Sequence, residues 1–161
     1  MPAPVVTPTG SVDLMFLFNQ AGHALNARLN AALDNVGVSP REWCVLTKAM
    51  TGEHTQGALA EMAGVDKTTM VVTLDRLEGE GLAERRPSST DRRARIVGVT
   101  TAGEEAAAEA GAIVDRVVAE TLGTLRPEQA DAFVAALTAL VDGPLASPSH
   151  TTAQVRRARR A

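Results

Sequence analysis

Apolar residues recur at spacings of three, four and seven early in the chain, the pattern of one buried face of an α-helix. The pattern predicts a long helix from Ser11, and Gly37 is expected to end it. The residues before Ser11 include three prolines and read as a flexible arm. The apolar positions of this first helix are Leu14, Leu17, Phe18, Ala21, Leu25, Ala32 and Val36.

The segment "SPRE" predicts the start of a second helix. Ser39 is suited to cap it, Pro40 to occupy its first position, and Glu42 to complete a capping box. We expect this helix to end near Gly52. Its apolar side is predicted to hold Trp43, Leu46 and Met50.

A short helix, a glycine turn and a longer helix are predicted over "TQGALAEMAGVDKTTMVVTLDRLEGEG". Thr55 is expected to cap the short helix, and Asp66 the longer one. Gly64 between them can adopt a positive φ. This order is that of a helix-turn-helix. The inward residues are predicted to be Leu59, Ala60 and Met62 in the short helix, and Met70, Thr73, Leu74 and Leu77 in the longer one.

The segments "LAERR" and "RARIVGV" are predicted to form a β-hairpin around the polar turn "PSSTDR". Residues 85–100 contain five arginines and a single acid, Asp91, although the 161-residue chain has a formal net charge of -3. A basic hairpin directly after a helix-turn-helix indicates a winged helix, in which the helix enters the DNA major groove. The net charge does not oppose this, because charges are screened beyond roughly 8 Å.

Thr100 is expected to cap a further long helix, and Pro127 to open a last one. The predicted fold is mainly α with a small β-hairpin, a winged helix-turn-helix with terminal dimerisation helices. The predicted regions are a flexible arm (1–10), dimerisation helices (11–36 and 101–142), a DNA-binding lobe (37–100) and a flexible basic tail (143–161).

Composition narrows the class of protein. Aromatic residues make up only 2% of a chain that is 45% hydrophobic, so the core is thin and a partner chain is expected to bury more surface. A single cysteine, Cys44, excludes an internal disulfide. Without a secretory signal or a membrane-spanning run, we expect a cytoplasmic protein that does not bind membranes. The histidines are not clustered and no catalytic motif is found, so we predict neither an enzyme nor a metal or other cofactor.

The segment "LAEMAGVDKTTMVVTLDRLEGEGLAERRPSSTDRRARIVGVTTAGE" resembles the core of the MarR (multiple antibiotic resistance regulator) family. It is most specific in "RLEGEGLAERR", "DRR" and "VTTAGE", and the helix order matches over residues 11–142. The resemblance implies a homodimeric transcription regulator that binds double-stranded DNA at a pseudo-palindromic operator. It further implies release from DNA by a small molecule or by oxidation, and we expect a repressor that responds to a small-molecule effector.

In the predicted recognition helix, Lys67, Thr68 and Thr69 lie at the N-terminus, where they would meet a phosphate or base edges. Val72 is expected to point outward and to touch a thymine methyl, although exposed apolar surface is also ordinary. Arg76 would either reach a phosphate or pair with Asp75 or Glu80. The remaining candidate DNA contacts lie in the hairpin: Arg86, Arg92, and, from the resemblance, the wing-tip Arg93 with Asp91 as the acid that orients the wing.

The effector pocket is placed by the resemblance where the first, second and fifth helices meet the DNA-binding lobe. Candidates by position are His23, Arg28, Trp43 and Met50, for each of which ordinary packing is the alternative. Two other functions remain open, an oxidant sensor acting through Cys44 and a winged-helix module that binds protein instead of DNA. The arginines of the tail, Arg156, Arg157, Arg159 and Arg160, would add DNA affinity or only solubility.

Overall fold

The computed structural model describes residues 6, 10–91 and 93–146. The predictions for most of the N-terminal arm, for Arg92 and for the tail arginines therefore lie outside the described residues. The chain divides into two compact units, Met1–Ala119 and Glu120–Ala161, and each is described by itself.

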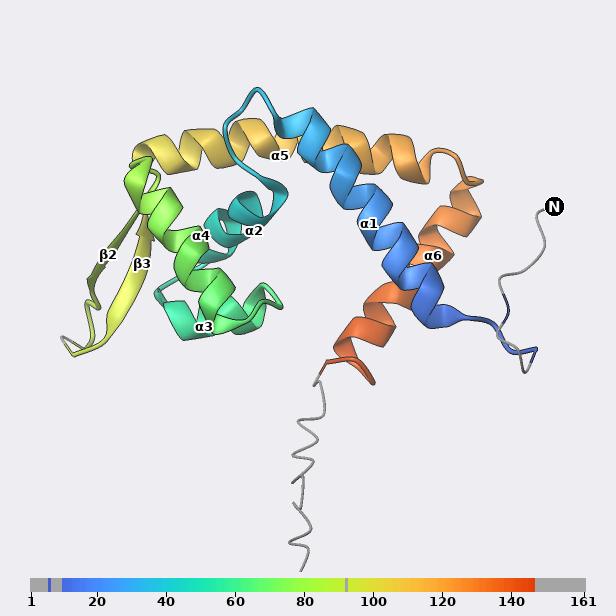
Figure 1. Ribbon diagram of the computed structural model, residues 1–161, viewed down its shortest axis with the longest axis horizontal. Helices are drawn as coiled ribbons and strands as arrows, with labels where there is room; N and C mark the ends of the chain where they lie inside the picture. The colour runs from blue at the N-terminus through green and yellow to red at the C-terminus, as the bar shows by residue number, and fades with distance from the viewer. Residues whose placement is uncertain (1–5, 7–9, 92, 147–161) are drawn as a thin grey trace, which may run out of the picture. The chain divides into compact units, whose positions relative to one another are not determined.

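The first unit contains the helix-turn-helix and its hairpin, and Figure 1 shows the hairpin strands β2 and β3 extending beside α4. The mainly helical fold with a β-hairpin is as predicted. Helix α5 continues across the boundary at Ala119, and the second unit holds α6. The elements are α1 (Leu14–Leu33), α2 (Pro40–Ala49), β1 (His54–Thr55), α3 (Gln56–Met62), α4 (Lys67–Gly79), β2 (Ala83–Pro87), β3 (Arg95–Val99), α5 (Thr101–Leu122) and α6 (Pro127–Asp142).

The hairpin belongs to a three-stranded antiparallel sheet with the order β1-β3-β2. Strand β1 pairs His54 with Val97 and was not predicted, because two residues are too short to show alternation. In the hairpin, Ala83 pairs with Val99 and Pro87 with Arg95. The sheet thus ties the segment between α2 and α3 to the hairpin.

The predicted helix caps are present. Ser39 and Glu42 form the capping box of α2, since the Glu42 carboxylate accepts the Ser39 N–H at 2.7 Å. Asp66 caps α4 by accepting the Thr69 N–H at 2.9 Å. Thr100 caps α5 by accepting the Gly103 N–H at 3.1 Å. These local bonds fix where α2, α4 and α5 begin.

The core of the first unit is aliphatic, with Leu33, Leu46 and Leu59 almost completely buried. The predicted inward face of α4 is confirmed, because Met70, Thr73, Leu74 and Leu77 are all buried.

Two methionines predicted to face inward are exposed instead. Met62 is 41% exposed, because it lies two residues after the buried Ala60 and therefore roughly opposite it on a helix of about 3.6 residues per turn. Met50 is 50% exposed, because α2 ends at Ala49 and Met50 is its C-cap.

The start of α5 packs directly on the backbone that precedes β2. Gly103 is buried there, and a Cβ atom on it would lie 2.0 Å from the Leu82 carbonyl oxygen and 2.8 Å from Val99 Cγ1. Thr100 holds the same contact, since its N–H donates to the Leu82 carbonyl at 3.1 Å. Only glycine fits at position 103, so the glycine of "VTTAGE" has a packing reason.

Candidate nucleic-acid interface

One face of helix α4 is exposed to solvent, and it carries both polar and apolar side chains. Lys67 and Thr68 are exposed at its N-terminus, and Val72 is 65% exposed, as predicted for an outward residue. Val71 is 38% exposed beside it. Since the opposite face is buried, this exposed face is the only one that α4 can offer to a ligand.

Thr69 differs from its two neighbours. It is half-buried, and its hydroxyl donates to the Asp66 carboxylate at 2.6 Å. Hydrogen bonds from the Thr69 side chain, and then from its backbone, hold the pKa of Asp66 below the ordinary value of 3.8. The Thr69 hydroxyl proton is thus engaged in the cap, which leaves Lys67 and Thr68 as the accessible side chains of the first turn.

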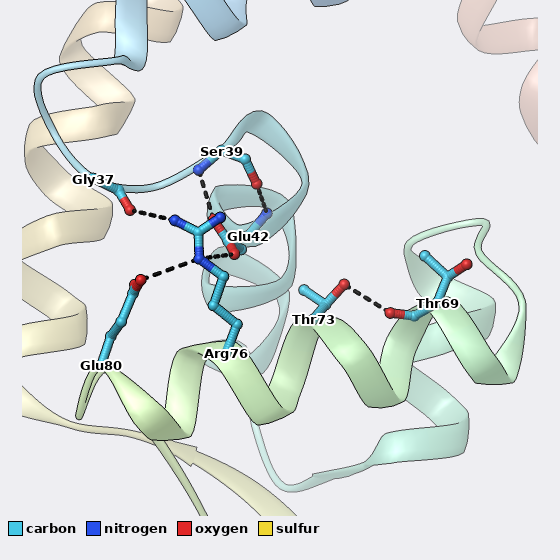
Figure 2. Close-up of polar contacts among 7 residues, drawn as sticks. All are labelled: Gly37, Ser39, Glu42, Thr69, Thr73, Arg76 and Glu80. Atoms are coloured by element: carbon cyan, nitrogen blue, oxygen red, sulfur yellow. Dashed lines mark hydrogen bonds and ion pairs between the residues drawn. The ribbon is translucent and has the colours of Figure 1, made fainter.

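Arg76, in the last part of α4, is held by the protein itself. Figure 2 shows its guanidinium between three acceptors. Nε lies 3.2 Å from the Glu42 carboxylate and 3.1 Å from that of Glu80, and Nη2 donates to the Gly37 carbonyl at 3.3 Å. The hydrogen bond to Glu80, and then the charge of Glu42, raise the pKa of Arg76. The predicted pairing with Glu80 is confirmed, and the alternative pairing with Asp75 is wrong.

Asp75 instead pairs with Arg85, which projects from β2 toward α4. Arg85 Nη2 lies 2.8 Å from Asp75, and Nη1 pairs with Glu78. The Arg85 backbone N–H also donates to Glu78 at 2.7 Å. These bonds fix the angle between the hairpin and α4, and they neutralise one of the five hairpin arginines.

The other described hairpin arginines, Arg86, Arg93 and Arg95, are exposed, and none forms an ion pair with a described residue. The Arg86 side chain crosses Gly98 on the neighbouring strand, where an added Cβ would lie 2.9 Å from Arg86 Nε. Positive charge is therefore available along β2 and at the tip of the hairpin.

The turn of the hairpin is ordered by two carboxylates. Asp91 accepts the Arg93 N–H at 2.9 Å. Glu53, from the loop between α2 and β1, accepts the Ser88 hydroxyl at 2.6 Å and the Ser89 N–H at 3.1 Å. Neither Glu53 nor Ser88 was predicted as a site residue, because an isolated acid in a polar loop carries no periodicity or motif.

The candidate effector residues are dispersed within the first unit. Trp43 Nε1 donates to the Ala107 carbonyl of α5 at 3.1 Å, so this indole links α2 to α5. His23 and Arg28 are exposed on α1. Met50 lines a surface hollow with Glu53, Arg86 and Glu104.

A second hollow opens beside the Arg76 contacts. Asn30, Asp34, Gly37 and Arg76 take part in its lining. Neither hollow is lined by His23, Arg28 or Trp43, so the structure does not bring the four predicted residues into one of these two sites.

Neither a membrane-spanning helix nor a metal-binding cluster occurs among the described residues. No described helix is long and apolar enough to cross a membrane. No group of three or more His, Cys, Asp or Glu side chains able to hold a metal ion occurs among residues 6, 10–91 and 93–146.

A helix-turn-helix followed by a basic hairpin, which belongs here to a three-stranded sheet, defines a winged helix. Residues 36–94 match the MarR family. A stretch of 79 residues is 40% identical to the transcriptional regulator HosA of Escherichia coli O157:H7, covering 49% of this chain and 58% of that protein. The DNA-binding lobe of the chain is therefore similar to MarR-family transcription regulators, and the chain spans little more than half the length of the curated relative that it matches.

Solved structures share the fold over most of the chain. CouR of Rhodococcus jostii RHA1 bound to p-coumaroyl-CoA is 25% identical, with a TM-score of 0.71 over 80% of this chain and 91% of that one. CouR bound to a 23-mer DNA duplex gives a TM-score of 0.73 at 25% identity, over 80% and 92%. Wild-type MarR from E. coli, at 24% identity, has a TM-score of 0.67 over 83% and 98%.

Proposed function

We propose that the protein is a homodimeric, sequence-specific DNA-binding transcription regulator, a repressor that a small-molecule effector releases from a pseudo-palindromic operator. The observation that carries the DNA-binding part is the distribution of charge in the lobe. Arg76 and Arg85 are paired with carboxylates, whereas Lys67, Arg86 and Arg93 are exposed on α4 and the hairpin. In a chain of net charge -3, these three accessible cations thus lie on the two elements that would meet phosphates.

The two elements are expected to do different work on DNA. Thr68 and Val72 on α4 would face the major groove, where each base pair has a distinct pattern. Arg93 at the hairpin tip would lie in or over the minor groove, which attracts cations but distinguishes bases poorly. The solved complex of the relative CouR with a DNA duplex supports this use of the fold.

Dimer formation is supported by large apolar side chains that are exposed among the described residues of α1 and α6. On α1, Leu14, Leu17 and Phe18 are 52%, 40% and 37% exposed. On α6 no residue is buried, and Phe133 is 51% exposed. Val114 of α5, by contrast, is 6% exposed and belongs to the core of the first unit. A partner chain would remove the exposed groups from water, and a stable monomer at micromolar concentration in sedimentation would contradict this.

The effector part of the proposal rests on the relatives, since CouR has been solved with p-coumaroyl-CoA. The four candidate effector residues remain predictions. Trp43, whose indole links α2 to α5, is the one best placed to contact a ligand bound near these two helices.

DNA binding is tested by selecting genomic fragments on the purified protein, then measuring affinity for a duplex of the selected sequence over a range of salt concentrations. We expect half-sites roughly 10 base pairs apart and a steep fall of affinity with salt. Arg93→Ala should weaken binding to every DNA and lower the salt slope by about one unit. No selected sequence and no salt-dependent binding would leave the protein-interaction alternative.

A further inference from the structure

The hairpin turn is joined to the body of the lobe through Glu53. The Glu53 carboxylate accepts the Ser88 hydroxyl at 2.6 Å and the Ser89 N–H at 3.1 Å and 3.2 Å from its two oxygens. Ser88 is buried and stands next to the last residue pair of the hairpin, with its N–H donating to the Ala94 carbonyl at 3.0 Å. A charged group of the α2–β1 loop is therefore bonded to the point where the strands open into the turn.

The hydrogen bond to Glu53 determines which further hydrogen bonds the Ser88 hydroxyl can form. A serine hydroxyl has one proton and two lone pairs, and a carboxylate can only accept. Because the Ser88 proton is committed to Glu53, its lone pairs face the turn, where they receive the Thr90 N–H at 3.1 Å and the Asp91 N–H at 3.3 Å. Asp91 in turn accepts the Arg93 N–H at 2.9 Å.

We propose that Glu53 is a positioning residue that sets the tip of the hairpin, and with it Arg93, for contact with DNA. The hydrogen bonds run without a break from Glu53 through Ser88 and Asp91 to the Arg93 backbone. The DNA role rests on the proposed function, whereas the ordering of the turn does not.

The sign of the effect separates this role from simple electrostatics. Removing an acid near a DNA-binding surface should strengthen binding, because it removes repulsion from phosphates. Removing Glu53 should weaken it, because Arg93 loses its fixed position. The loss should not exceed that caused by Arg93→Ala, because the hydrogen bonds of Glu53 reach the DNA contact through the hairpin turn.

The experiment compares Glu53→Ala and Ser88→Ala with the control Glu104→Ala. Glu104 lines the same hollow as Glu53, but its side chain makes no hydrogen bond or ion pair with the described part of the chain. Amide hydrogen exchange should accelerate at residues 89–91 in the first two variants and stay unchanged in the control, with the rest of the lobe still protected. This readout needs no DNA, so it decides the ordering role even if the proposed function fails.

Affinity for the selected duplex is then measured in the wild-type and Arg93→Ala backgrounds. We expect Glu53→Ala to weaken binding about three- to tenfold in the first background, the scale of one mispositioned phosphate contact, and not at all in the second. Glu104→Ala should bind as tightly as wild type or more tightly. Unchanged exchange at residues 89–91, or an equal loss in both backgrounds, would overturn the inference.

Discussion

Removing Arg76 is expected to destabilise the fold without affecting DNA contacts. The Glu42 side chain is 4% exposed, and Arg76 is the positive group that faces it at 3.2 Å. In Arg76→Ala the Glu42 carboxylate keeps the Ser39 N–H at 2.7 Å but loses its charged partner. A buried carboxylate without a counterion is costly, so the loss should fall on the free energy of unfolding.

The size of the stability loss in Arg76→Ala depends on how exposed the Arg76–Glu42 pair is. A hydrogen bond to a charged group is worth about 1.5–3 kcal/mol. Because the Arg76 side chain is 52% exposed, water screens part of the interaction, and we expect a loss of about 1–2 kcal/mol. For a chain of this size that corresponds to a fall in Tm of about 2–8 °C.

The assay is urea unfolding followed by circular dichroism, in wild-type and Glu42→Gln backgrounds. Glutamine keeps an acceptor for Ser39 but carries no charge, so Arg76→Ala should cost clearly less there. An equal cost in both backgrounds would refute the reasoning, because it would show that Arg76 does not act through Glu42. The salt slope of DNA binding should not change in Arg76→Ala, and a fall of about one unit would instead support the DNA contact predicted from the sequence.

Four further results are expected. Gly103→Ala should strongly lower the Tm in thermal unfolding, because the added Cβ would lie 2.0 Å from the Leu82 carbonyl oxygen. Gly79→Ala is the control, since an added Cβ there has nothing within 4 Å, and it should be neutral or stabilising by up to about 1 kcal/mol. Hydrogen bonds from Thr69 lower the pKa of Asp66 in the folded protein, so the stability from this cap is complete above pH 3.8 and is lost as the pH falls through the lower folded pKa. Asp66→Asn should remove that part of the acid dependence of Tm. An identical dependence of Tm on pH in the variant and the wild type would contradict this. Val72→Ala should change the preference at a thymine, checked by a thymine-to-uracil swap in the selected duplex, while nonspecific affinity stays the same. Cys44 is half-buried, so peroxide should not release DNA from the protein, and a release that Cys44→Ser abolishes would establish the oxidant-sensing alternative.

The sequence predicts the basic hairpin but not which of its arginines are accessible. Five arginines in sixteen residues predict a basic wing, and strand alternation predicts that only part of them can face one side. Which ones do so depends on the carboxylates that approach from elsewhere. Arg85 is neutralised by Asp75 and Glu78 of α4, and this pairing requires β2 to lie against that helix.

The partners of Arg76 and Glu53 also come from elements that are distant in the sequence. The sequence presents Arg76 beside Asp75 and Glu80, but its buried partner, Glu42, comes from a different helix. Glu53 reaches the hairpin turn only because β1 pairs with β3, and a two-residue strand leaves no pattern to detect.

The amino-acid sequence by itself determined what depends on neighbours along the chain. The caps at Ser39, Asp66 and Thr100 and the buried face of α4 all rest on bonds and spacings within a few residues. Only the tertiary structure decided which side chains are engaged in the fold and which are accessible. Ion pairs such as Glu42 with Arg76, and close contacts such as Gly103 with Leu82, join positions whose separation carries no local signal, so they exist only once the elements have packed.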